Sequence, residues 1–138
     1  MKREIILHCS DSPWGNAAII TVWHKDRGFR NCGYNFVLLN GKISQSFEFK
    51  SFNGAIETGR ALDEDGAHTL NHNDAIGICL IGKSGQFTSE QIESCHQLIH
   101  SLKIKYDIGA VKQHSDYDPV NKSFCAGFSK EMMERFNK

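Results

Sequence analysis

Two histidines and one cysteine stand where the chain could bind a metal ion. His8 ends the first apolar run of the sequence, His114 ends the last one, and Cys125 lies eleven positions further on. Two imidazoles and one thiolate are a common ligand set in catalytic zinc sites, which leave the fourth position open for water. The residue types therefore predict a zinc site, and hydrolysis by a zinc-activated water is the chemistry that such a site supports.

Two other arrangements of histidine and cysteine stay open at this point. His96 and His100 are four positions apart on an expected helix, like the histidines of H-E-x-x-H metalloproteases, but Gln97 replaces the glutamate base. We therefore interpret this pair as the solvated edge of an amphipathic helix. If no metal binds, Cys125 and His114 could instead form a thiolate–imidazole pair for nucleophilic catalysis.

The elements that must position these residues follow from hydrophobic patterns and turn signals. Apolar runs predict strands at 4–9, 34–39, 75–81 and 109–113, and the Asn40-Gly41 turn predicts a hairpin with a return strand over 42–49. A short strand follows the turn at Asn53-Gly54, and the polar segment 59–74 is expected to be a long loop.

Helices are expected on both sides of the long loop. The first covers 16–27 and the last covers 129–136. The second begins at the capping box formed by Thr88 and Gln91. The second helix carries an apolar stripe with 3,4 spacing, formed by Ile92, Cys95, Ile99, Leu102 and Tyr106. The sequence thus predicts an α/β fold with one domain over 1–138, in which a mixed central sheet of about five strands is flanked by helices.

Composition narrows the class of protein. Lys plus Arg equals Asp plus Glu, 16 against 16, which argues against nucleic-acid binding and against stable membrane association through bulk positive charge. Five cysteines are an odd number in a chain with a substantial core, and reduced thiols in a cytoplasmic protein are the simplest reading. The apolar run after the basic start is too short for a signal peptide, so we expect synthesis in a cytoplasm.

An ordered series of segments resembles the zinc-dependent N-acetylmuramoyl-L-alanine amidases of the type 2 class. This family includes the small lysozymes of T-odd phages and the animal peptidoglycan-recognition proteins. The matching segments follow the order of the family over nearly the whole chain: 7–10, 22–25 with Gly28, 33–36, 57–60, 66–68, 71–73 running into 76–82, and 114–116 through Lys122 to 125–128.

The resemblance implies specific roles. Zinc would be held by His8, His114 and Cys125, while Tyr34 and Lys122 would assist catalysis. His68 and Asn73 would lie near the substrate. The bond cut would be the amide between N-acetylmuramic acid and the L-alanine of the stem peptide in bacterial peptidoglycan.

Three departures from the family pattern stand out. The histidine that usually follows the tyrosine is replaced by Asn35, and Lys122 lies three positions before Cys125, not two. The stretch 44–55 is longer than in compact phage members and is interpreted as an added hairpin beside the cleft. We expect a monomeric phage or prophage endolysin that accumulates in the host cytoplasm. The alternative is a peptidoglycan-recognition module that binds peptidoglycan without cutting it.

Overall fold

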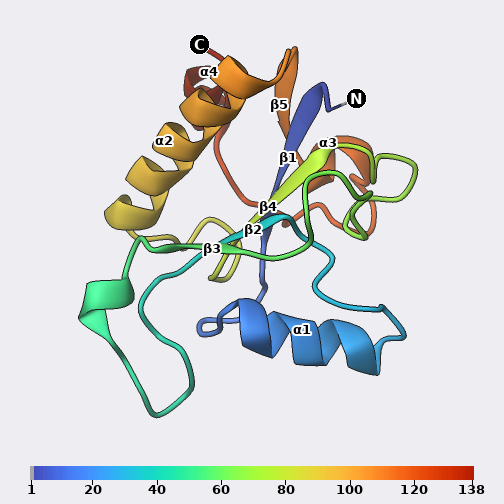
Figure 1. The fold of residues 1–138 in the computed structure, drawn as a ribbon. Coiled ribbons are helices and arrows are strands. Elements are labelled where there is room, and N and C mark those ends of the chain that lie inside the picture. The colour runs from blue at the N-terminus through green and yellow to red at the C-terminus, as the bar shows by residue number, and fades with distance from the viewer. Residues whose placement is uncertain (1) are drawn as a thin grey trace.

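A five-stranded mixed sheet forms the centre of the molecule in this computed structural model, which describes residues 2–138 (Figure 1). The strand order is β3-β2-β4-β1-β5, and only β3 is antiparallel to its neighbour. The strands are β1 (Glu4–Cys9), β2 (Phe36–Leu38), β3 (Ile56–Thr58), β4 (Ile76–Leu80) and β5 (Ala110–Gln113). The predicted α/β fold with a mixed sheet of about five strands is confirmed.

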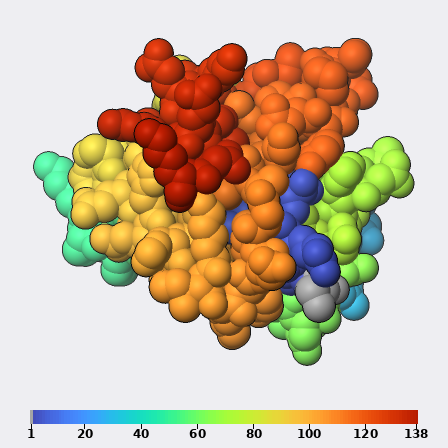
Figure 2. Space-filling model, turned by 90° about the horizontal axis from the view of Figure 1, so that it is seen from above, coloured from blue at the N-terminus to red at the C-terminus, as the bar shows by residue number. Residues whose placement is uncertain are grey.

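Helices cover the two faces of the sheet, which explains why the central strands are continuous apolar runs. All five residues of β4 are buried. On one face, α2 (Ser89–Lys105) and α4 (Lys130–Phe136) pack over the larger apolar cluster, and Figure 2 shows α4 in red lying beside α2. On the other face, α1 (Ala17–Asp26) covers a smaller cluster that includes Ile20 and Cys79.

The helix boundaries agree with the capping signals of the sequence. The Asn16 side chain accepts a hydrogen bond from the backbone N–H of Ile19 and begins α1. The predicted capping box of Thr88 and Gln91 begins α2, and Gln91 also donates to the backbone oxygens of Leu38 and Ile81. A buried amide in α2 therefore ties this helix to the sheet.

The predicted return strand over 42–49 is wrong. That stretch contains only an isolated bridge between Lys42 and Glu48, followed by the short 3-10 helix η1 (Lys50–Phe52). The place beside β2 is taken by β3, with Val37 opposite Glu57. Residues 40–55 therefore project from the edge of the sheet as a loop (Figure 1).

The topology places the carboxyl ends of β1 and β5 side by side. Leu7 is paired with Gln113, so His8 lies beside His114, the first residue after β5. The chain turns at once into α3 (His114–Tyr117), a short helix that the sequence analysis missed. Among residues 2–138, no helix has the length and apolar character that crossing a membrane requires.

Candidate metal centre and active-site cleft

The structure brings the three predicted metal ligands together. One donor atom each from His8, His114 and Cys125 lies within 4.8 Å of the others. The Nδ1 atoms of the two histidines face one another at 3.2 Å. His8 and Cys125 are buried, and His114 is half-buried. The donors come from the end of β1, the start of α3 and the loop before α4.

The geometry and chemistry of these donors fit a zinc ion. Two nitrogens bound to zinc at 2.0–2.1 Å with tetrahedral angles are about 3.3–3.4 Å apart, close to the 3.2 Å between the two Nδ1 atoms. Burial is the main cause that lowers the pKa of His8, and the positive charge that the nearby His68 and His114 can carry lowers it further. Burial and the nearby Lys122 also lower the pKa of His114. Both imidazoles are therefore neutral at physiological pH, which is the form that binds metal.

The Cys125 sulfur is held at the end of β1. The backbone N–H of Cys9 donates to the Cys125 Sγ at 3.2 Å, a contact that favours the thiolate. Contact with the Cys9 side chain and burial act in the opposite direction and raise the pKa of the Cys125 thiol. A metal ion would have to displace this proton, so metal binding at this site would release a proton to solvent.

A cavity of about 670 Å³ opens beside the three donors, and two of them, His114 and Cys125, line it. Tyr34 and Lys122 line it as well. The Tyr34 ring lies 5.0 Å from the His8 ring, and burial raises the pKa of the phenol well above its usual value. Tyr34 therefore stays protonated and can donate a hydrogen bond. The altered spacing before Cys125 leaves Lys122 in the wall of the cavity.

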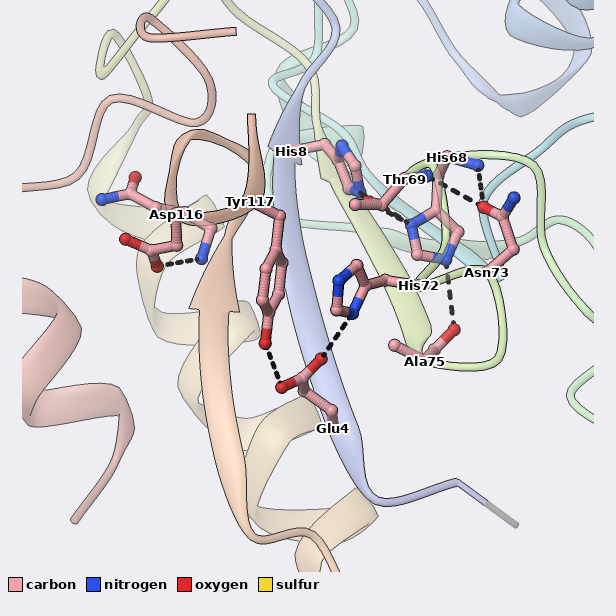
Figure 3. A network of polar contacts seen from close by, with 10 residues as sticks. Glu4, His8, His68, Thr69, His72, Asn73, Ala75, Asp116 and Tyr117 are labelled. Atoms are coloured by element: carbon pink, nitrogen blue, oxygen red, sulfur yellow. Dashed lines mark hydrogen bonds and ion pairs between the residues drawn. The ribbon is translucent and has the colours of Figure 1, made fainter. Parts of the chain in front are cut away.

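The loop 59–74 carries His68 and Asn73 to the same cavity. The Asn73 side-chain oxygen accepts hydrogen bonds from the backbone N–H groups of His68 (2.7 Å) and Thr69 (2.9 Å). His68 is buried, and its Nδ1 lies 3.0 Å from Nε2 of His8 (Figure 3). Their predicted contact with substrate stays a prediction, while the hydrogen bonds show how the loop itself is held.

A second contact fastens this loop to α3. The His72 ring stacks on the Tyr117 ring with centroids 3.8 Å apart. The Tyr117 hydroxyl donates to the Glu4 carboxylate, which also lies 3.8 Å from Nδ1 of His72 (Figure 3). Burial and this contact with Glu4 raise the pKa of Tyr117. The segments that carry His68 and His114 are therefore connected through the start of β1.

Asn35, at the position where the family usually has histidine, cross-links three backbone segments. Its Nδ2 donates to the backbone oxygens of Arg60 (3.0 Å) and Ala61 (3.3 Å), and its Oδ1 accepts from the N–H of Gly77 (2.9 Å). The side chain is 1% exposed and is not among the groups that line the cavity. Asn35 therefore stabilises the backbone around the site and does not line the cavity itself.

The sequence analysis missed the contribution of α1 to the cavity. Trp23, His24 and Arg27 of this helix all line the cavity. The signal in the sequence was the spacing: His24 follows Ile20 by one helical turn and so falls on the same face, which places a polar group there. The stretch 44–55, expected beside the cleft, contributes no residue to its lining.

The family of the chain follows from its similarity to known proteins. Residues 2–127 match the family described as N-acetylmuramoyl-L-alanine amidase. The chain belongs to this family. The amidase is 29% identical over 128 residues to the endolysin of Enterobacteria phage T3, covering 85% of this chain and 77% of that protein. It is also 29% identical over 126 residues to the endolysin of Escherichia phage T7, with 83% and 76% covered.

Solved structures show the same fold. The amidase LysC from Clostridium intestinale URNW superimposes with a TM-score of 0.80 at 25% identity, covering 99% of this chain and 85% of that one. A peptidoglycan recognition protein, PGRP-LE in complex with tracheal cytotoxin, gives 0.71 at 20% identity, with 97% and 78% covered. The predictions of the family, of the fold and of an amidase enzyme are confirmed. The roles of individual residues stay predictions.

Proposed function

We propose that the chain is a zinc-dependent endolysin that hydrolyses the amide between N-acetylmuramic acid and L-alanine in bacterial peptidoglycan. The observation that carries the proposal is the convergence of His8, His114 and Cys125 beside an open cavity that His114 and Cys125 line. Membership of the amidase family and the similarity to phage endolysins support the substrate. Bound at this triad, zinc would supply an activated water and polarise the amide carbonyl.

The remaining residues of the cleft have separate tasks in this proposal. Tyr34 keeps its proton and would donate a hydrogen bond to the amide oxygen as negative charge develops on it. The Lys122 ammonium, in the wall of the same cavity, would stabilise that charge from another side. Asn73 and the apolar rings of Trp23 and Phe29 would position the glycopeptide in the cavity.

The biological setting is part of the proposal. We propose that the protein is a monomer of phage or prophage origin, which collects in the host cytoplasm and reaches the wall after the membrane is permeabilised. Its balance of 16 basic and 16 acidic residues suits an enzyme whose partner is peptidoglycan and not nucleic acid or a membrane surface.

Digestion of purified peptidoglycan tests the bond that is cut. We expect new L-alanine amino termini and no new reducing sugar ends. New reducing ends without amino termini would mean that a glycosidic bond is cut, and the proposal would be wrong. Binding to peptidoglycan with neither product would favour the alternative of a recognition module.

A further inference from the structure

The two ring nitrogens of His8 face different partners. Its Nδ1 points to the other two predicted metal ligands and lies 3.2 Å from Nδ1 of His114. Its Nε2 lies 3.0 Å from Nδ1 of His68 and 3.4 Å from the hydroxyl of Thr69 (Figure 3). A neutral imidazole carries one proton, so only one of these nitrogens can have a free lone pair for a metal. The partner of Nε2 therefore decides whether Nδ1 can bind.

The other nitrogen of His68 fixes the direction of the hydrogen bonds. His68 Nε2 lies 3.1 Å from the backbone oxygen of Ala75. A carbonyl oxygen only accepts, so Nε2 of a neutral His68 carries the proton and its Nδ1 is an acceptor. That Nδ1 has one lone pair, which faces His8 Nε2 at 3.0 Å and the Thr69 hydroxyl at 2.9 Å. Two bare nitrogens would repel one another at 3.0 Å, so His8 Nε2 must carry a proton. The chain of contacts thus protonates His8 on Nε2 and leaves its Nδ1 free.

The His68 ring occupies a slot that two glycines leave open. A Cβ added to Gly77 would lie 2.7 Å from Cδ2 of His68, and a Cβ at Gly66 would meet the same atom. Asn73 holds the backbone of His68 and Thr69 through its side-chain oxygen. The ring is therefore held in one orientation by the close approach of Gly66 and Gly77 and by its polar contacts with His8, Thr69 and Ala75.

We propose that His68 is a positioning residue that holds His8 in its Nε2–H tautomer and so presents Nδ1 as a metal donor. The inference rests on the proposed metal site but assigns His68 a task beyond substrate contact. Partners of this kind, which accept the second N–H of a ligating histidine, typically change metal affinity by about 10–100-fold. Here the partner is an imidazole whose own orientation is set by the backbone of Ala75.

Zinc affinity of a matched variant pair is the first test. We expect His68→Leu to raise the zinc dissociation constant by about 10–100-fold, measured by competition with a chromophoric chelator. His24→Leu is the control, because it also removes a buried imidazole from the cavity wall and one hydrogen bond, from the N–H of Gly33. It should leave the dissociation constant unchanged. His68→Asn, whose Oδ1 can take the place of Nδ1, should restore most of the lost affinity.

A second variant tests the slot without removing a polar group. Gly77→Ala should push the His68 ring away from Nε2 of His8 and weaken zinc binding in the same direction as His68→Leu. Unchanged affinity in both variants would overturn the inference. Failure of the wild-type protein to bind zinc would instead overturn the proposed function, so the two failures are distinguishable.

Nitrogen NMR of the metal-free wild-type protein tests the tautomer directly and needs neither zinc nor activity. The ¹⁵N shifts and two-bond couplings of His8 should show a protonated Nε2 and a bare Nδ1 at neutral pH. A substantial population protonated on Nδ1 would overturn the inference, whatever the variants do. This measurement also decides the question if His68→Leu does not fold.

Discussion

His96 and His100 lie one turn apart on α2, whereas His8, His68 and His114 come from three segments that are distant in sequence. Among residues 2–138, the helical pair joins no group of possible metal ligands: the ring centroids of His96 and Phe136 are 4.4 Å apart, and His100 is exposed. The distant group converges, with nitrogen–nitrogen distances of 3.0 and 3.2 Å. Regular spacing along a helix is therefore a weaker sign of a metal site than the topology of the sheet.

The physical reason lies in what each element has to do. One face of α2 buries Cys95, Ile99 and Leu102 against the sheet, and its histidines occupy the margins of that face. β1 and β5 are adjacent and parallel, so residues at their carboxyl ends meet at one edge. Polar groups at that edge can be buried because they bind one another.

The largest effect should follow from loss of a metal ligand. We expect His8→Ala, His114→Ala and Cys125→Ser each to lose bound zinc and to reduce amidase activity to background, because catalytic zinc sites hold the ion with three protein ligands. Metal analysis and wall digestion would measure both. The double variant with His96→Gln and His100→Gln should retain both, and full zinc content in the three single variants would contradict the assignment.

A graded result is expected at the third ligand. Cys125→Asp should retain more zinc and activity than Cys125→Ser, because a carboxylate is also a good zinc ligand and a serine hydroxyl is not. The comparison uses the same position and the same assays. Equal loss in the two variants would mean that the sulfur has a task other than binding metal.

Tyr34→Phe should have the next largest effect. Removal of one hydrogen bond to a transition-state oxygen typically reduces the rate by ~10²–10³-fold, while deletion of a single hydroxyl should barely change packing. Zinc content and thermal stability should stay at the wild-type level, which separates catalysis from folding. Turnover near that of the wild type would remove Tyr34 from the mechanism.

Lys122→Ala should cost less than Tyr34→Phe. We expect about a tenfold loss of turnover, equivalent to ~1.4 kcal/mol of transition-state stabilisation. Lys130→Ala, at the exposed start of α4, is the matched control and should have no effect. A larger loss in Lys122→Ala than in Tyr34→Phe would reverse the proposed division of roles.

Changes in the α2 region should alter stability and leave zinc binding intact. Ile99→Ala creates a cavity in the core, where Ile99 is 2% exposed, and should lower the free energy of unfolding by about 2–5 kcal/mol. Ile104→Ala, on the same helix but 75% exposed, should change it by less than about 0.5 kcal/mol. Denaturant unfolding and zinc titration of both variants would show whether the two regions are independent.

Local signals in the sequence were sufficient to predict many of the helices and strands that form the scaffold. Asn16 and Thr88 begin their helices where the capping preferences place them, and the apolar run of β4 is buried on both faces. The convergence of His8 and His114 could be expected because each ends an apolar run that predicts a strand. The hairpin after Asn40-Gly41 could not be excluded locally, since its failure depends on β3 occupying the place beside β2.

The surroundings of the site were less accessible to sequence reasoning. The spacing of Lys122 is irregular, yet the loop keeps it in the cavity wall. The contact of His68 with His8 depends on space left by Gly66 and Gly77, which are 11 positions apart in sequence. Such arrangements arise from tertiary packing, and no local pattern encodes them.

Reconstitution of the metal-free protein tests the central claim most directly. After chelation and removal of the chelator, release of L-alanine amino termini from peptidoglycan should be absent. It should return in proportion to added zinc and reach its plateau at one zinc ion per chain. Full activity in the metal-free protein, or recovery that is the same in His114→Ala, would contradict the account of His8, His114 and Cys125 as the metal centre of this amidase.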